Sequence, residues 1–395
     1  MHVERIHTAS QLAALAVDWN TLADSMPFRT WDWLATWWKF YGSGSHRELL
    51  TSRQLFVLAV YDDFEADAHS GSRKLIGIAP WRLDHNAIQG SVIRWIGEGE
   101  VCTDHLSLVS RPINASRVAS AVAEALTSEF ADWDRLDLDN VDADDATIAQ
   151  LMTALAEHAC QVQQEASNAC WVLDLPNTWD DYLAGISKSH RKQLRQLERR
   201  VLESDRPEWH RVESKSDLDQ AWEVLVDLHQ RRRQSLGEPG CFASQTFHDF
   251  HREVVDLLVE RNALRMSWME LDGIPAAAEY HLAGGDTTYA YQGGVDPERL
   301  DDEPGRLSTI LCLRHAIEEG HRQIDFLRGD EPYKAHWRAT PRHTLNYRVI
   351  PNRPIARLRG QVLAAADTLA DWARNSLERT RSFATNQPQL DPAVG

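Results

Sequence analysis

Cysteine is scarce in this sequence, and the cysteines that are present lie far apart. The 395-residue chain has five of them, with no CxxC pair and no paired spacing. Closely spaced cysteines mark a disulfide framework or a zinc site, so we expect neither, and the pattern is typical of a reducing compartment. His248 and His251 lie one helical turn apart, but no further ligands accompany them, and we expect no metal.

Long hydrophobic runs and an excess of positive charge are also missing. No stretch reaches the roughly 18 apolar residues that cross a bilayer, and the N-terminal residues contain no apolar signal segment. We therefore expect a cytoplasmic protein with no membrane span. The formal net charge of −17 argues against general nucleic-acid binding, which needs a basic surface, so DNA is not an expected partner.

The sequence lacks the GxSxG, P-loop and GxGxxG motifs, which argues against the enzyme classes that these motifs mark. It does have 43 % apolar and 26 % charged residues, enough for ordinary cores, and its length predicts two domains. Among its 15 tryptophans, Trp33 and Trp37 are spaced as on one helix face and are expected to pack in a core.

One supersecondary pattern occurs twice along the chain. Each copy has two apolar β-like runs, a further strand, a helix of 3.6-residue period and a last strand that carries an aspartate. The second copy has an Asp-Gly hairpin signal at 272–273. The paired runs are 55–60 with 74–80 and 264–270 with 274–278; the helices are 116–130 and 305–319; the aspartates are Asp137 and Asp325.

The duplicated pattern predicts an α/β (α+β) chain of two domains with one topology, each a mixed, mostly antiparallel sheet flanked by helices. We expect domains at 1–170 and 171–354, a linker near 168–176, and a long helix over 179–203 that opens the second domain. An amphipathic helix is expected to begin at Ile355 and to pack on the body, and with the loose tail it makes up residues 355–395.

Function is expected where the second copy has polar and glycine residues that the first lacks. Its helix begins with Pro304-Gly305, where free N–H groups allow a phosphate to approach. Its last strand leads into the polar segment 328–337, at the strand end where α/β folds place ligands. The helix around 188–200 also carries a ridge of basic residues, which is either a solvated face or a phosphate-binding surface.

Several of these residues resemble one family. The pattern Pro27-Phe28-x-Thr30-x-x-Trp33, with Thr103-Asp104, Pro304-Gly305-x-Leu307 and Asp325-Phe-x-Arg328-Gly329-x-x-x-Tyr333-Lys334-x-x-Trp337, is similar to the CelD-like branch of the GNAT superfamily. These acyltransferases were first linked to cellulose biosynthesis, and in architecture they resemble the Fem-type aminoacyltransferases. The resemblance covers about residues 27–337 and implies two tandem GNAT-like domains, with the chemistry in the second.

The resemblance implies an N-acyltransferase that moves an acyl group, in the first instance acetyl, from acyl-CoA to an amine. The acceptor would be a small molecule, often a sugar or nucleotide sugar, in polysaccharide or natural-product assembly. The superfamily's usual pyrophosphate loop is absent, so Pro304-Gly305 would replace it. The alternatives are a Fem-type transferase that uses aminoacyl-tRNA and a non-catalytic protein that keeps the fold as a binding or scaffolding module.

The same resemblance assigns roles to individual residues. Lys334 is the candidate for stabilising the oxyanion, Tyr333 for protonating the leaving thiolate, and Asp325 and Glu279 for the base. The repeat offers a structural explanation for Asp325, because Asp137 matches it in the first copy. The cofactor-binding candidates are Pro304, Gly305, Arg306, Leu307, Arg191, Arg195 and Arg328; the substrate-binding candidates are Asp104, Tyr291, Gly293, Asp330 and Trp337.

Overall fold

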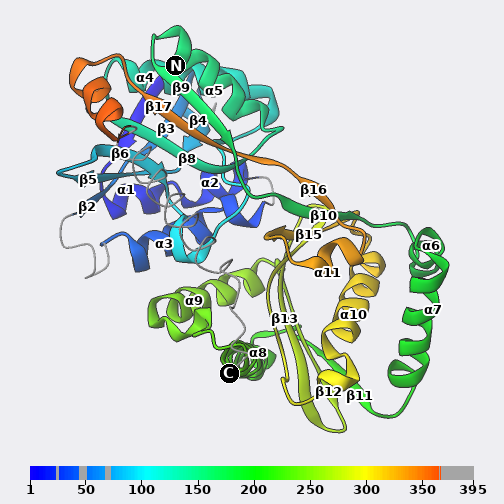
Figure 1. The fold of residues 1–395 in the computed structure, drawn as a ribbon. Helices are drawn as coiled ribbons and strands as arrows, with labels where there is room; N and C mark the ends of the chain where they lie inside the picture. The colour runs from blue at the N-terminus through cyan, green and yellow to red at the C-terminus, as the bar shows by residue number, and fades with distance from the viewer. Residues whose placement is uncertain (24–25, 44–50, 67–72, 364, 366–395) are drawn as a thin grey trace, which may run out of the picture.

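The computed structural model describes every residue except 24–25, 44–50, 67–72, 364 and 366–395. Figure 1 shows two bodies of strands with helices on their faces, one formed mainly by the first half of the chain and one by the second. The predicted mixed α/β fold, with sheets flanked by helices, is confirmed. Among the described residues, no helix has the length and apolar character needed to cross a membrane.

The first half has two sheets. One has the strand order β1-β3-β4-β7 and the other the order β2-β5-β6-β8-β17-β9. The strands are β1 His2–Ile6, β2 Thr51–Leu55, β3 Val57–Ala66, β4 Arg73–Ala79, β5 Trp81–Asn86, β6 Gly90–Trp95, β7 Val109–Ser110, β8 Arg135–Asp142 and β9 Gln161–Ala166. The helices are α1 Ala9–Ala14, α2 Ala16–Leu22, α3 Trp31–Tyr41, α4 Ala115–Thr127 and α5 Ala146–Glu157.

The second half has one sheet of order β11-β12-β13-β14-β15-β10-β16. Its strands are β10 Cys170–Asp174, β11 Pro207–Arg211, β12 Leu264–Leu271, β13 Ile274–Gly284, β14 Thr287–Val295, β15 Gln323–Arg328 and β16 Thr340–Arg342. Strand β17, Thr344–Ile350, follows β16 along the chain and belongs to the larger sheet of the first half. The helices are α6 Trp179–Gly185, α7 Lys188–Leu197, α8 Lys215–Ser235, α9 Gln245–Glu260, α10 Pro304–Glu318 and α11 Pro332–His336. Helix α10 packs on one face of this sheet, and α8 and α9 pack on the other (Figure 1).

The internal repeat is visible in the strand pairing. In each half, two parallel neighbouring strands are connected through a helix. Strand β6 pairs with β8, with α4 in the connection, and β14 pairs with β15, with α10 in the connection. In the second copy, Asp272 and Gly273 both have positive φ, of 56° and 76°, as the tight hairpin turn requires. Trp33 and Trp37 of α3 are buried at 1 % and 2 % exposure, as predicted.

The division of the chain differs from the prediction in two places. Residues 344–350, which we assigned to the second domain, form β17, and this strand pairs with β8 and β9 in a sheet of the first half. The predicted linker at 168–176 contains β10, which lies between β15 and β16 in the second sheet. Both strands are short, and their partners lie far away in the sequence, so local patterns did not reveal the crossovers.

The predicted long helix over 179–203 is interrupted. It breaks between α6 and α7, where Ser187 has extended backbone angles and its hydroxyl caps the amide of His190. Residues 354–363 are helical, as expected for the start of the C-terminal helix. This start of the helix packs on the first half, as expected, through Ala356, which is 1 % exposed, and through the ion pair of Arg359 with Asp134. The apolar side chains of Ile355, Leu358 and Val362 are exposed. The rest of that helix and the tail lie outside the described residues.

Candidate active site

Strands β14 and β15 separate after a short parallel pairing. They pair only from Thr287 with Gln323 to Tyr289 with Asp325. Beyond this point β14 continues along β13 and β15 continues along β10. A bulge in β14 leaves Tyr291 without a partner in β13 and bends the strand at the point of separation. We call this divergence, residues 290–295 facing residues 326–328, the wedge.

The two faces of β15 point to different surroundings because side chains alternate along a strand. Ile324 and Phe326 pack with Leu307 beneath α10, whereas Leu327 joins the core shared with the first half. Asp325 points to the same side as Leu327, away from α10. The α10 side of the wedge therefore holds one group of polar residues and the side facing the first half holds another.

Glu279 of β13 is the central carboxylate on the α10 side. The Ser308 hydroxyl donates to its Oε1 at 2.6 Å, and the His281 Nε2 atom lies 3.2 Å from its Oε2. Gly293 stands opposite Glu279 in the β13–β14 ladder, and a Cβ atom there would lie 2.8 Å from Oε2. Glycine at this position leaves room for the carboxylate at the wedge.

Tyr333 of α11 reaches the same place from the β15 side. Its side chain is 49 % exposed, and its ring meets that of Phe326 edge to face at 6.0 Å. Partial burial, together with the nearby carboxylates of Glu279 and Glu331, raises the pKa of the Tyr333 phenol. The phenol therefore stays protonated near neutral pH and is available as a proton donor near Glu279.

A cluster of basic side chains lies at the start of α10. The rings of His190 and His336 are 3.9 Å apart, and Arg306 lies beside them. Burial is the main cause that lowers the pKa of His190 to about 4, and the charges of His336, Arg306 and Arg338 lower it further. Burial and the charge of Arg306 also lower the pKa of His336. The buried Nε2 of His190 and the Nε and Nη2 of Arg306 have no hydrogen-bond partner among the described residues. Basic groups that face one another with unused donors form a site for an anion.

The helix start itself contributes less than the sequence predicted. Glu303 precedes α10 with a left-handed φ of 57°, and its carbonyl accepts hydrogen bonds from the amides of both Arg306 and Leu307. Pro304 has no N–H, so only the Gly305 amide of this first turn has no acceptor among the described residues. Glu303 also forms an ion pair with Arg306 Nη1. The side chains of the cluster therefore offer more to an anion than the backbone does.

Lys334 occupies a different position from the one its predicted role requires. Its side chain is 2 % exposed, and Nζ donates to the carbonyl oxygens of Leu327, Arg328 and Gly329 at 3.1, 2.8 and 3.1 Å. Glu331 Oε2 lies 2.9 Å from the same nitrogen. An ammonium group has three N–H donors, so these contacts use all of them. The geometry supports a structural role for Lys334, holding the segment after β15, and leaves no donor for an oxyanion.

A second buried network joins the halves of the molecule on the other side of the sheet. Arg328 Nε lies 2.5 Å from Asp104 Oδ1, and the Arg328 amide donates to Asp104 Oδ2 at 3.2 Å. His105 lies between Asp142, 3.0 Å from Nδ1, and Asp325, 3.2 Å from Nε2. Although burial opposes the charge, these two carboxylates raise the pKa of His105 to about 10, so the imidazole is a cation at neutral pH.

Asp104→Leu is expected to lower the free energy of unfolding by about 3 kcal/mol. The change leaves the partly buried Arg328 guanidinium without its carboxylate. Chemical denaturation measures the loss, and Asp104→Leu combined with Arg328→Met is the matched control. The double variant should be more stable than the single one, because it leaves no unpaired charge. Equal stability of the two would contradict this account of the pair.

Several predicted site residues belong to these structural networks. Asp325 accepts the Leu327 amide at 2.7 Å and faces His105, so the structural explanation fits it better than the role of base. Asp104 and Arg328 pair with each other and are not free for acceptor and phosphate. The Tyr291 hydroxyl donates to the Val101 carbonyl at 2.5 Å in the contact between the halves.

The remaining candidates divide between core and surface. Trp337 and Leu307, at 2 % and 0 % exposure, are core residues and do not face a ligand. Arg195 is exposed and lies 3.4 Å from Asp180, whereas the partly buried Arg191 donates to a backbone carbonyl at 3.4 Å. Asp330 is exposed and accepts a hydrogen bond from the Trp171 indole at 3.3 Å.

The sequence analysis did not single out five polar residues that lie around α10, either at its start or between it and the sheet. They are His190, His336, Ser308, His281 and Cys312. A signal for three of them was present: Ser308 and Cys312 are four residues apart on a helix, and Glu279 and His281 are two apart on a strand. Polar residues at these spacings share a face in each element and mark a polar interface between them.

The wedge lies within a segment that matches a known family. Residues 188–335 match the family model described as acetyltransferase (GNAT) domain. The solved structure of FemX superposes with a TM-score of 0.57 at 12 % identity, over 91 % of this chain and 99 % of that one. The C-terminal domain of a putative lysylphosphatidylglycerol synthetase from Agrobacterium fabrum gives 0.50 at 11 % identity, over 92 % and 98 %. Curated proteins gave no match. Residues 188–335 are thus similar to a GNAT acetyltransferase domain, and they lie within an overall fold similar to that of FemX.

Proposed function

We propose that the protein is an N-acyltransferase that uses acyl-CoA, with the pantetheine arm lying along the wedge. The observation that carries the proposal is the separation of β14 from β15 after the pair Tyr289–Asp325. Beyond that pair, neither strand offers the other a ladder partner, so an extended amide-containing chain can hydrogen-bond to the facing strand edges. The start of α10 and the Glu279 carboxylate both border the wedge, next to Val295 and Gly293.

The basic cluster suits the diphosphate of CoA. His190, Arg306 and His336 come from three separate helices and converge at the start of α10. The unpaired nitrogens of His190 and Arg306, with the Gly305 amide, match an acceptor-rich anion better than they match a neutral ligand. In this arrangement Arg306 and Gly305 keep the cofactor-binding role that the sequence predicted.

The residues at the wedge divide the chemistry between them. The acceptor amine arrives as an ammonium ion, and the Glu279 carboxylate takes one proton from it, so the neutral nitrogen attacks the thioester carbonyl carbon. Backbone N–H groups on the strand edges stabilise the oxyanion. As the carbon–sulfur bond breaks, the Tyr333 hydroxyl gives its proton to the thiolate. The Tyr333 phenolate then takes the second proton that the nitrogen loses, and Glu279 releases the first proton to solvent, so the products are the amide, free CoA and one proton. In this scheme Lys334 only positions the loop.

The acceptor in this proposal is a small-molecule amine, with an amino sugar or nucleotide-linked sugar in polysaccharide or natural-product assembly as the first class to test. A Fem-type aminoacyl-tRNA donor is the alternative, since the fold is similar to that of FemX. The overall charge of −17 counts against it. Two arginines of the basic ridge are also already paired, Arg195 with Asp180 and Arg200 with Glu303.

Calorimetry with acetyl-CoA tests the proposal. We expect micromolar binding to the wild type and binding weaker by at least about tenfold in Arg306→Ala, because one phosphate contact is lost. Arg314→Ala, on the same helix but facing Glu198, is the matched control and should bind normally. No binding of acetyl-CoA or longer acyl-CoAs to the wild type, together with binding of an aminoacyl-tRNA, would replace this donor with the alternative.

CoA binding is expected to take up protons and to tighten as the pH falls from 8 to 6. In the free protein the lowered pKa values of His190 and His336 keep both rings neutral. A phosphate beside them favours the protonated form and raises both pKa values, so each ring that becomes charged takes up a proton. Calorimetry in buffers of different ionisation enthalpy measures the uptake. A variant with His190→Asn and His336→Asn should lose it, and no uptake by the wild type would rule out this phosphate site.

A further inference from the structure

A row of polar side chains lies between α10 and the sheet beneath it. Ser308 on α10 hydrogen-bonds to Glu279 on β13, and Glu279 contacts His281 two residues further along the strand. Most of this interface is apolar, with Leu307, Ile310 and Leu313 all fully buried. A buried polar row within an apolar interface costs stability unless its members are paired, so each member is expected to have a polar partner.

The register of helix and strand places Cys312 opposite His281. Four residues along α10, from Ser308 to Cys312, advance by about 6 Å, and two residues along β13, from Glu279 to His281, advance by about 7 Å. Both elements run in the same direction, so the second pair faces as the first does. Cys312 and His281 line the same pocket, as this register requires, and the Cys312 thiol lies 4.0 Å from the Ser267 hydroxyl.

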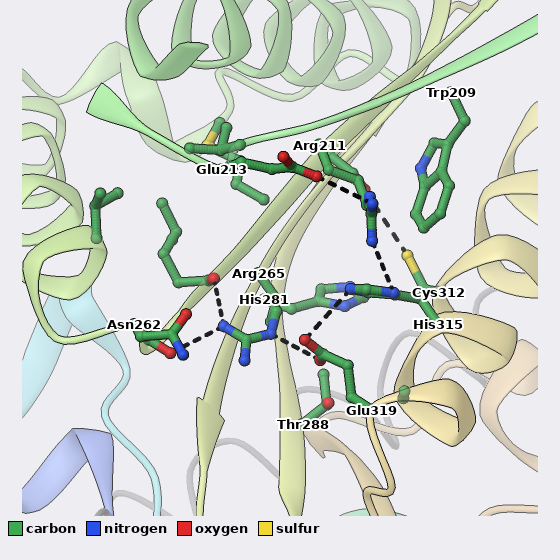
Figure 2. Close-up of a pocket in the computed structure, with 16 residues that line it drawn as sticks. Trp209, Arg211, Glu213, Asn262, Arg265, His281, Thr288, Cys312, His315 and Glu319 are labelled. Carbon is green, nitrogen blue, oxygen red and sulfur yellow. Dashed lines mark hydrogen bonds and ion pairs between the residues drawn. The ribbon is translucent and has the colours of Figure 1, made fainter. Parts of the chain in front are cut away.

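Cys312 and His281 both line a pocket of about 230 Å³, shown in Figure 2. The pocket is under the C-terminal half of α10, away from the basic cluster at the helix start. Figure 2 shows Arg211, His315 and Glu319 around the same space, with Arg211 bonded to His315 at 3.2 Å. Cys312 is partly exposed there, so a small molecule that enters the pocket can reach its sulfur.

The His281 imidazole carries the charge that the thiol needs. Although burial opposes protonation, Cys312 and Glu279 raise the pKa of His281 to about 10. The ring therefore favours the imidazolium form when the sulfur is ionised, and it can stabilise negative charge on the sulfur on one side while the Glu279 carboxylate holds it from the other. Partly exposed cysteines in such positive surroundings are the reactive ones in proteins.

Cys241 also lies beside a histidine, but that histidine has no carboxylate partner. Its sulfur lies 3.6 Å from His229 Nε2, so it too has a histidine partner. The other nitrogen of His229 meets the Gln230 amide oxygen at 3.2 Å, where His281 meets a carboxylate. Burial raises the pKa of Cys241 to about 12 and lowers the pKa of His229, so this pair stays neutral.

We propose that Cys312, His281 and Glu279 form a thiol–imidazole–carboxylate site, in which Cys312 is a nucleophile toward small electrophiles that enter the pocket of Figure 2. In the reaction with iodoacetamide, the sulfur forms a bond to the methylene carbon as the carbon–iodine bond breaks. Iodide leaves, and the thiol proton passes to solvent. The site is separate from the proposed acyl-CoA binding, although Glu279 belongs to both.

Alkylation of each cysteine by iodoacetamide in the native protein at pH 7, followed by peptide mass spectrometry, tests the proposal. We expect Cys312 to react at least about tenfold faster than the exposed Cys102 and the paired Cys241. His281→Gln should slow Cys312 by at least about tenfold and leave Cys102 unchanged, which also reports that the variant is folded.

Glu279→Gln provides a second test if His281→Gln does not fold, since it keeps the shape of the side chain and removes only the charge. It should slow Cys312 severalfold. Reaction of Cys312 no faster than that of Cys102 in the wild type would overturn the proposal. An unchanged rate at Cys312 in folded His281→Gln, or in folded Glu279→Gln, would overturn it as well. Because the assay needs no acceptor and no acyl-CoA, its outcome is independent of the proposed acyltransferase activity.

Discussion

Lys334→Met is expected to lower the free energy of unfolding by about 3–5 kcal/mol, because the ammonium is buried and has no substitute. The carbonyl oxygens of Leu327, Arg328 and Gly329 all point at its Nζ. The backbone there is unusual, with φ of 57° at Leu327 and 114° at Gly329. Methionine fills the same volume but donates nothing, so three buried acceptors lose their partner.

Urea denaturation measures this effect, with Lys192→Met as the control, since Lys192 is an exposed lysine on α7. The control should unfold at nearly the same urea concentration as the wild type. A Lys334→Met protein of unchanged stability would contradict the structural role. If that protein also lost acyl transfer while keeping acetyl-CoA binding, a direct catalytic role for Lys334 would return.

Glu279→Gln is expected to lower kcat/KM for acyl transfer by about 10²–10⁴-fold while leaving acetyl-CoA affinity within about twofold. The amide keeps the shape of the side chain and can still accept the Ser308 hydroxyl, but it cannot take a proton from an ammonium ion. Release of the CoA thiol, with the best amine acceptor found for the wild type, measures the rate.

Two further variants separate the loss of the base from a general disturbance of the wedge. Ser308→Ala removes one hydrogen bond to the carboxylate and should cost less than Glu279→Gln. Glu318→Gln, on the exposed end of α10, should have no effect. If Glu279→Gln retained full activity, the base would have to be sought elsewhere. A larger loss at Ser308→Ala than at Glu279→Gln would point to the hydroxyl instead.

Sequence patterns predicted the turns, helices and strands whose formation depends on residues close together in the chain. The Asp272-Gly273 turn and the strand–helix–strand order around α10 were visible because each depends on neighbouring residues. The break between α6 and α7 was missed, although Ser187 is a good helix cap, because apolar spacing runs through it. The place of β17 was missed because its partners, β8 and β9, are about 200 residues away along the chain.

The sequence singled out two segments that the structure brings together, but it could not give the surroundings of their residues. The motif ending in Tyr333-Lys334 and the Pro304-Gly305 helix start both lie at the wedge, as expected for the carboxyl end of a strand. Whether a polar residue faces a ligand or a partner inside the protein depends on tertiary contacts. Lys334 and Asp104 found buried partners, whereas His190 was left with an unused nitrogen.

A structure of the protein with bound acetyl-CoA tests the central claim most directly. The account predicts the diphosphate beside His190, Arg306 and His336, and the pantetheine between residues 290–295 and 326–328, with the thioester within reach of Glu279 and Tyr333. A complex in which acetyl-CoA lies elsewhere, with β14 and β15 unoccupied between these residues, would contradict it.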